Sequence, residues 1–197
     1  MNFVGEAKKA IQDDYLAAAL SIGVPYAAFR AVMTVEAGGS GFDSANRPKI
    51  LFERHIFYRL LKNLPEKLAK ATEAGLAYPK WGEKPYPKGS EAVYAELTAA
   101  CEIDETAALQ STSWGLGQIM GSNFKMAGCD SVQEMVEQAK ESEANQLLHM
   151  ANFIKHANLC DELCRQDWAG FAKGYNGPAY QKNQYDVKLE QAYNKFA

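Results

Sequence analysis

Apolar residues recur every three to four positions along most of the chain, a pattern that predicts a succession of α-helices. Residues 5–20 carry alanine, isoleucine and leucine at this spacing, and Gly23 is a suitable C-terminal stop for that helix. Pro25 fits the first position of the next helix, because the N–H group that proline lacks is not needed there. This second helix is predicted to run to Glu36 and to stop at Gly38-Gly39.

The same periodicity predicts helices to the end of the chain, and Ser131 with Glu134 forms a capping box before one of them. Residues 47–52 are predicted to form a short strand, which leaves room for a small β-hairpin near residues 40–52. Residues 75–89 are rich in proline and glycine and are predicted to form an irregular loop. The other predicted helices cover 53–61, Ser90 to about Cys101, a segment capped by Asp104, 132–140, 145–157, 168–175 behind an Asp167 cap, and 186–196.

These elements predict one mostly α domain over residues 1–197, and the composition agrees with that. The apolar fraction of 47% and the charged fraction of 23% are those of a globular protein. Because 21 basic residues face 24 acidic ones, we expect no nucleic-acid partner. The chain holds neither an apolar run of about 18–20 residues nor the apolar core of a signal peptide, so we expect no stable membrane association and synthesis in a cytoplasm.

The four cysteines are too sparse for a disulfide scaffold, and buried free thiols are the favoured interpretation. His156, Cys160 and Cys164 follow one another at intervals of four, so a single helix could place them on one face. One helix supplies no fourth ligand, however, and no metal site and no cofactor are predicted.

Glu36 is the first candidate for chemistry, because it ends an apolar helical face. Phe29, Val32 and Met33 precede it by seven, four and three positions, which lie on one side of a helix. A carboxyl group at the end of such a stripe has its pKa raised by burial and by the negative end of the helix dipole. A carboxyl that stays protonated near neutral pH can act as a general acid. The alternative is that Glu36 faces solvent in the last turn.

Four segments in this order resemble the peptidoglycan N-acetylmuramidases of phage endolysins, which belong to the lysozyme-like superfamily with goose-type lysozymes and soluble lytic transglycosylases. They are TVEAGGSGF, NRPKILFERHIFYRLL, STSWGLGQIMGSNF and AKGYNGP. ILFERHIFYR is distinctive of the endolysin family, while WGLGQIMG and YNGP resemble motifs of the superfamily. The resemblance implies a lysozyme-like fold that cleaves the β-1,4 bond between N-acetylmuramic acid and N-acetylglucosamine, with Glu36 as general acid.

The WGLGQIMG segment is a candidate substrate-binding motif. Its glycines would let the backbone approach a ligand closely, although a tight turn packed on the core would explain them too. Gln118 offers a donor and acceptors to sugar hydroxyl or acetamido groups, and Trp114 can stack on the apolar face of a sugar. The candidate substrate-binding residues here are Trp114, Gly117, Gln118 and Ile119.

The YNGP segment supplies two more candidates. The resemblance places Tyr175 and Asn176 in the cleft that faces the acid, where the Tyr175 phenol can hydrogen-bond the catalytic carboxyl or the sugar and Asn176 can bind substrate. The alternative is a helix stop with a structural tyrosine.

Glu53 is the second candidate catalytic carboxylate, because apolar residues four and seven positions later draw its face inward. It could orient or activate a water molecule, or it could form an ion pair with Arg54, His55 or Arg59. His55 is expected to be structural, and Asp43 is an alternative holder of the water.

The second carboxylate favours hydrolysis over lytic transglycosylation, in which the C6 hydroxyl of muramic acid attacks and leaves a 1,6-anhydro end. A non-catalytic module that binds peptidoglycan is a third possibility. We expect a monomer whose partner is the glycan strand of peptidoglycan. The resemblance implies that it stays in the host cytoplasm until a holin pore releases it to the periplasm and cell wall.

Overall fold

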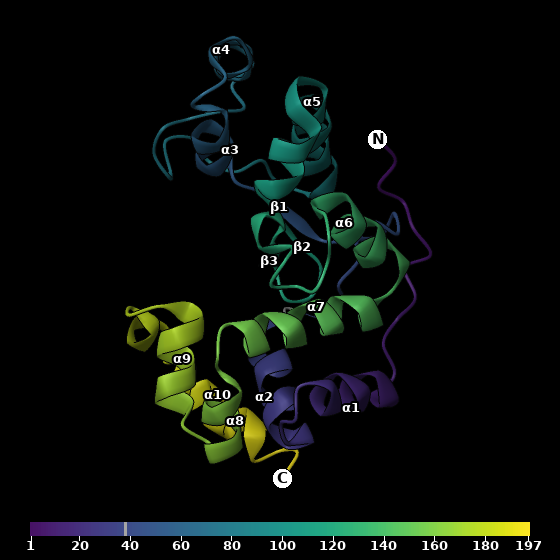
Figure 1. Cartoon of the computed structure of the whole chain (residues 1–197), viewed down its shortest axis with the longest axis vertical. Helices are drawn as coiled ribbons and strands as arrows, with labels where there is room; N and C mark the ends of the chain where they lie inside the picture. The colour runs from purple at the N-terminus through teal and green to yellow at the C-terminus, as the bar shows by residue number, and fades with distance from the viewer. Residues whose placement is uncertain (38) are drawn as a thin grey trace.

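Helices dominate the computed structural model, which describes residues 1–37 and 39–197 (Figure 1). A small antiparallel sheet in the order β1-β2-β3 accompanies them, so the predicted mostly α, lysozyme-like fold class is confirmed. The helices are α1 Gln12–Ser21, α2 Tyr26–Glu36, α3 Arg54–Leu61, α4 Pro65–Glu73, α5 Ser90–Gln110, α6 Val132–Glu141, α7 Glu143–His156, α8 Cys160–Arg165, α9 Trp168–Asn176 and α10 Tyr185–Tyr193. The strands are β1 Ile50–Phe52, β2 Thr112–Trp114 and β3 Ile119–Met120, and short 3-10 helices cover Gly121–Asn123 and Tyr180–Asn183.

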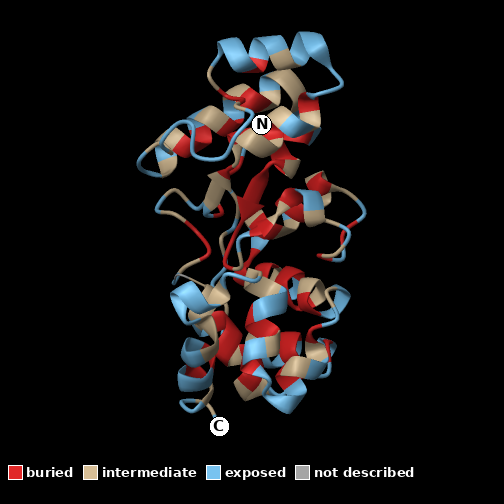
Figure 2. Cartoon of the chain, turned by 90° about the vertical axis from the view of Figure 1, so that its left-hand side faces the viewer, coloured by how far each residue is buried: buried red, intermediate tan, exposed pale blue. Residues whose placement is uncertain are grey.

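Helix α7 lies between two groups of elements (Figure 1). The lower group contains α1, α2, α8, α9 and α10, and the upper group contains α3 to α6 with the sheet. Buried residues run through the centre of both groups, whereas the outer helix α4 is largely exposed (Figure 2). The chain passes from the lower to the upper group between α2 and β1, so Glu36, the last residue of α2, lies at the junction.

Helix α2 is stabilised by contacts on two sides, one of which is its buried apolar stripe. Phe29, Val32 and Met33 are at most 3% exposed, as the sequence predicted. On another side of α2, the guanidinium carbon of Arg30 lies 4.2 Å from the ring centroid of Tyr15 and 4.7 Å from that of Phe196. These contacts join α2 to α1 and to the C-terminus. They also fix the direction in which α2 ends.

The start and stop of α2 differ slightly from the prediction. Pro25 precedes the helix instead of occupying its first position. The helix ends at Glu36, and Ala37 is already extended. Of the predicted stop, Gly38 lies outside the described residues, and Gly39 has a φ of +102°.

The prediction of a helix over residues 5–20 is wrong for its first part, because α1 begins only at Gln12. Residues 5–11 form no helix, Ala7 has a φ of +52°, and the segment bonds to distant parts of the chain. Lys8 forms a parallel bridge with Ser142, and the N–H of Gly5 donates to the carbonyl of Asn46 at 3.0 Å. Tertiary hydrogen bonds thus outweigh the local helical pattern in this segment.

The sheet joins segments that are far apart in sequence. Residues 40–52 hold the predicted strand, β1, and one isolated antiparallel bridge between Phe42 and Pro48. The other two strands come from residues 112–120, where Ile50 pairs with Trp114 and Trp114 with Ile119. The Gly-rich motif that was predicted to bind substrate therefore begins at the last residue of β2 and contains β3.

The predicted helix cap at Asp104 is confirmed, whereas one predicted cluster comes apart. The range of α5 holds two helical segments that meet in a kink at Asp104, whose backbone is extended and whose Oδ1 accepts from the N–H of Ala107 at 2.9 Å, as an N-cap does. His156 ends α7 whereas Cys160 begins α8, so the His156, Cys160 and Cys164 stripe does not share a helix. In the described part of the chain, no three His, Cys, Asp or Glu side chains are grouped as metal ligands.

The four cysteines differ in exposure. Cys129 is buried as predicted, but Cys101 and Cys160 are half-buried and Cys164 is exposed. Within residues 1–37 and 39–197, no single helix has the length and apolar character to cross a membrane. Helices α1 and α2 meet that test only as a pair, and they are bent by 111°.

Glu143, at the start of α7, ties three segments together. It is 6% exposed, and its carboxylate accepts from the N–H of Ala10 at 3.0 Å, the N–H of Gly41 at 2.8 Å and the ammonium of Lys9 at 3.2 Å. Burial alone would raise its pKa, but these donors outweigh burial and hold the pKa below its ordinary value. The carboxylate therefore anchors the N-terminal segment and the loop after Glu36 to α7.

We expect Glu143→Ala to lower the free energy of unfolding at pH 7 by about 2–4 kcal/mol, because the buried N–H groups lose a charged acceptor. Since the folded-state pKa is depressed, the stabilisation is complete above the ordinary pKa of 4.5 and is lost as the pH falls through the folded value. The difference between wild type and variant should therefore shrink in urea titrations at acidic pH. The exposed Glu102→Ala serves as the control, and equal stability of Glu143→Ala and wild type at pH 7 would contradict the anchoring role.

Candidate active site

Glu36 ends α2 with its carboxyl group partly buried between the two groups of elements. The Nδ2 amide of Asn176, the last residue of α9, donates to Glu36 Oε1 at 3.0 Å. Burial raises the pKa of Glu36, and the Asn176 hydrogen bond and the charge of Lys188 on α10 only partly oppose that rise. The direction of this pKa shift is the one that the sequence predicted, and it favours the protonated form that a general acid needs.

Tyr175 is held rigidly beside Asn176. Its ring stacks on Phe171 with centroids 5.3 Å apart and meets the ring of Phe153 edge-on at 5.7 Å. Gly177, with a φ of +83°, then ends α9 in a conformation that favours glycine. The structure thus brings Glu36, Tyr175 and Asn176 into one cluster, as the sequence predicted.

Two polar atoms of this cluster are buried without a hydrogen-bond partner in the described part of the protein. They are the hydroxyl of Tyr175 and the Oδ1 oxygen of Asn176. Burial, together with the charge of Glu36, raises the pKa of the Tyr175 phenol, so the hydroxyl keeps its proton. Leaving such a group unpaired costs about 1–3 kcal/mol. One hydroxyl and one amide oxygen are therefore free to bond a polar ligand next to the acid.

Glu53 forms a second cluster at the start of α3. Its Oε2 accepts from the Tyr86 hydroxyl at 2.6 Å and lies 3.2 Å from His55 Nδ1. Burial, followed by the hydrogen bond and charge of Glu53, raises the pKa of Tyr86 to about 12. Of the three partners predicted for an ion pair with Glu53, the structure places His55 beside its carboxylate, whereas Arg54 pairs with Glu96 at 2.6 Å. Sequence reasoning missed Tyr86, since the loop that carries it has no periodic pattern.

Trp114 and Ile119 belong to the core. Trp114 is 2% exposed, its indole N–H donates to the carbonyl of Leu109 at 3.2 Å, and its ring lies 6.0 Å from that of Phe3. The prediction that Trp114 stacks on a sugar is therefore wrong, because neither ring face is open. Ile119 is 5% exposed, so its side chain offers no substrate contact either.

Gln118 uses its side chain to hold the turn between β2 and β3. Its Oε1 accepts from the Ser113 hydroxyl at 2.8 Å, and its Nε2 donates to the carbonyls of Gly115 at 2.8 Å and Lys49 at 3.1 Å. Gln118 nevertheless remains exposed, and its φ is +47°. Substrate binding by Gln118 stays a prediction, while its hydrogen bonds show that it also stabilises the turn.

The glycines of the motif allow close packing within the protein. A Cβ atom on Gly121 would lie 2.1 Å from the carbonyl oxygen of Leu109, and one on Gly117 would lie 2.6 Å from the sulfur of Met150. The tight turn packed on the core is thus the better explanation of these glycines than a close approach to ligand.

Asp43 organises the loop that follows Glu36. Its carboxylate accepts from the N–H groups of Ala45 and Arg47, each at 2.9 Å, from Arg47 Nε at 2.9 Å and from the Ser90 hydroxyl. Burial acts to raise its pKa, but these donors lower it overall. With so many donors already bound, the Asp43 carboxylate has little capacity left to hold a catalytic water.

A groove of about 500 Å³ lies beside the sheet and contains neither Glu36 nor Asn176. The site is centred on Glu36 nevertheless, because among residues 1–37 and 39–197 only there does a half-buried carboxyl of raised pKa adjoin unpaired polar atoms. The groove brings together two of the other candidates, Asp43 and Gln118. Its lining consists of Ser40, Asp43, Lys49, Ile50, Leu51, Gly89, Ser90, Val93, Gly115, Leu116 and Gln118.

The chain is similar to known proteins. The model of the N-acetylmuramidase family matches residues 25–197. The crystal structure of the Burkholderia AP3 phage endolysin is similar to the chain with a TM-score of 0.87 and 41% sequence identity, over 96% of this chain and 72% of that one. No curated protein matches the chain. The matched range contains Glu36, Glu53, Tyr175 and Asn176.

Proposed function

The chain belongs to the N-acetylmuramidase family, and from this premise we propose that it hydrolyses the β-1,4 bond between N-acetylmuramic acid and N-acetylglucosamine in peptidoglycan. The observation that carries the proposal is the partly buried carboxyl of Glu36, whose pKa is raised and which Asn176 orients.

The similarity of the chain to a phage endolysin supports a further proposal. We propose that the protein is made in a host cytoplasm and reaches the wall through a holin pore.

In the first step Glu36 acts as the general acid. Its proton moves to the glycosidic oxygen while the bond from that oxygen to C1 breaks, and positive charge develops on the sugar ring. Asn176 donates to Glu36 Oε1 and so fixes the carboxyl for this transfer. The Tyr175 hydroxyl and the Asn176 Oδ1 atom then bond polar groups of the bound sugar, which would supply the partners that these buried atoms lack.

Glu53 is proposed to orient the water that completes hydrolysis. Tyr86 and His55 contact the same oxygen of its carboxylate, so the other oxygen can accept a proton from water. A lytic transglycosylase would not need this carboxylate, because the C6 hydroxyl of muramic acid replaces water as the nucleophile.

We expect Glu36→Gln to lower lysis by about 10²–10⁴-fold, because an amide cannot donate the required proton. The variant should melt no lower than wild type at pH 7, since the folded state already disfavours the ionised carboxyl and the amide removes that penalty. Turbidity of permeabilised Gram-negative cells and thermal melting measure the two effects, with the exposed Glu102→Gln as control. A Glu36→Gln protein that melts like wild type and still clears cells would contradict the proposed mechanism.

The products distinguish hydrolysis from its alternatives. Mass spectrometry of peptidoglycan digested by the wild type should show reducing muramic acid ends, about 18 Da heavier than 1,6-anhydro ends. Anhydro ends would identify a lytic transglycosylase. Binding to purified peptidoglycan without any cleavage would identify a non-catalytic module.

We expect Glu53→Gln to lower lysis by about 10²-fold, because the amide cannot take a proton from water. Tyr86→Phe removes one hydrogen bond but keeps the carboxylate, so the expected loss is about tenfold or less. Thermal melting of both variants separates a loss of activity from a loss of fold. Glu53→Gln that stays folded and retains full activity would remove Glu53 from the catalytic step.

A further inference from the structure

Trp81 is the most exposed large hydrophobic residue in the described part of the chain. Its exposed fraction is 72%, whereas the other two tryptophans, Trp114 and Trp168, are exposed by only 2% and 9%. An isolated exposed aliphatic residue needs no explanation. An indole ring has more apolar surface than an aliphatic side chain, so leaving it in water forgoes more stabilisation. A tryptophan that stays exposed to water therefore suggests that a ligand covers it.

The loop that carries Trp81 is fixed to the upper group. The guanidinium of Arg54, which is 5% exposed, donates to the carbonyls of Lys84 at 3.2 Å and Pro85 at 3.1 Å. The same guanidinium pairs with Glu96 of α5 at 2.6 Å. Proline further restricts the backbone of this loop, because its ring fixes φ. Trp81 is thus presented by an anchored segment.

The loop of Trp81 also contacts the Glu53 cluster. The hydroxyl of Tyr86, five residues after Trp81, donates to Glu53 Oε2 at 2.6 Å. The ring of Trp81 itself stays largely in contact with solvent. An open ring on a loop that is held in place is suited to stacking.

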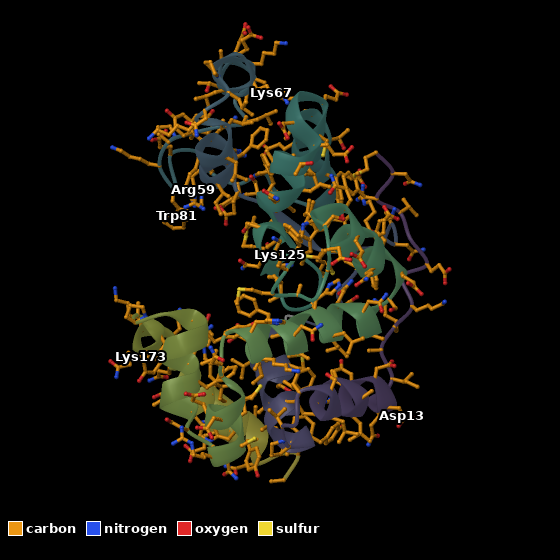
Figure 3. The ribbon with its side chains drawn as sticks, in the orientation of Figure 1. Asp13, Arg59, Lys67, Trp81, Lys125 and Lys173 are labelled. Carbon is orange, nitrogen blue, oxygen red and sulfur yellow. The ribbon has the colours of Figure 1, made fainter. Side chains whose placement is uncertain are left out.

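Trp81 lies on the side of the upper group that is turned toward the lower group. In Figure 3, which draws the side chains, it lies below Arg59 at the edge of the upper group, and Lys173 of α9 lies across the space from it. α9 ends at Asn176, which bonds Glu36. Trp81 thus lies on the side of the upper group toward α9 (Figure 3).

We propose that Trp81 is the stacking platform of a saccharide subsite, on which a pyranose ring of an N-acetylhexosamine packs with its C–H face. A pyranose presents C–H groups on its faces and polar groups at its rim, so it suits an indole face whose quadrupole is negative. The inference rests on the proposed function, because a glycan strand supplies the ring. The stacking role that the sequence suggested for Trp114 is thus assigned to Trp81.

The test measures binding directly, in the Glu36→Gln protein so that the probe is not cleaved. The probe is a β-1,4-linked tetramer of N-acetylglucosamine, and calorimetry gives its Kd. We expect Trp81→Ala to weaken binding about 3- to 10-fold and Trp81→Phe to retain most of it, because phenylalanine keeps an aromatic face. Leu20→Ala, which removes a 69% exposed side chain from α1, is the matched control and should leave Kd unchanged.

Tryptophan emission is a second readout, because Trp81 is the exposed member of the three. The tetramer should shift the emission of the Glu36→Gln protein saturably, and Trp81→Phe should abolish the shift. Equal Kd for Trp81→Ala and its parent would overturn the subsite even if the wild type cleaves peptidoglycan, so the proposed function would stand. An emission change caused by phosphatidylglycerol vesicles but not by the tetramer would also overturn it, in favour of a membrane contact.

Discussion

A hydrogen bond joins Asn176 at the end of α9 to Glu36 at the end of α2, and the packing of the lower group keeps these two helix ends together. The apolar stripe of α2 is buried, Arg30 links α2 to its neighbours, and Tyr175 is fixed between two phenylalanine rings. Because the carboxyl is thereby withdrawn from water, its neutral form is favoured. The fold thus raises the pKa of the acid before any substrate binds.

The upper group supplies the complementary parts by different means. Glu53 keeps an oriented carboxylate through Tyr86 and His55, and Arg54 fixes the loop that carries both Tyr86 and Trp81. Between the groups, the carboxylate of Glu143 holds the N-terminal segment and the loop after α2 on α7. An acid from the lower group and a carboxylate with an aromatic platform from the upper group would therefore face a glycan from two sides.

Sequence reasoning succeeded where the signal is local. The stripe before Glu36 and the cap at Asp167 depend on residues within two turns of one helix, and both were predicted. It failed where distant segments decide the outcome. Trp114 is buried because β2 lies inside the sheet. Residues 5–11 are not helical because they bond to α6, to α7 and to Asn46 in the loop before β1. Trp81 lies in a loop without periodicity, so only its exposure in the folded protein identifies it.

The most direct test is a titration of the Glu36 carboxyl carbon by NMR in ¹³C-labelled protein, with the resonance assigned by its loss in Glu36→Gln. The midpoint of the Glu36 titration should lie above the ordinary value of 4.5, because burial outweighs the Asn176 hydrogen bond and the Lys188 charge. In Asn176→Ala the midpoint should rise further, since the hydrogen bond that favours the ionised form is gone. A midpoint at or below 4.5 in the wild type would contradict the claim that the fold raises the pKa of Glu36.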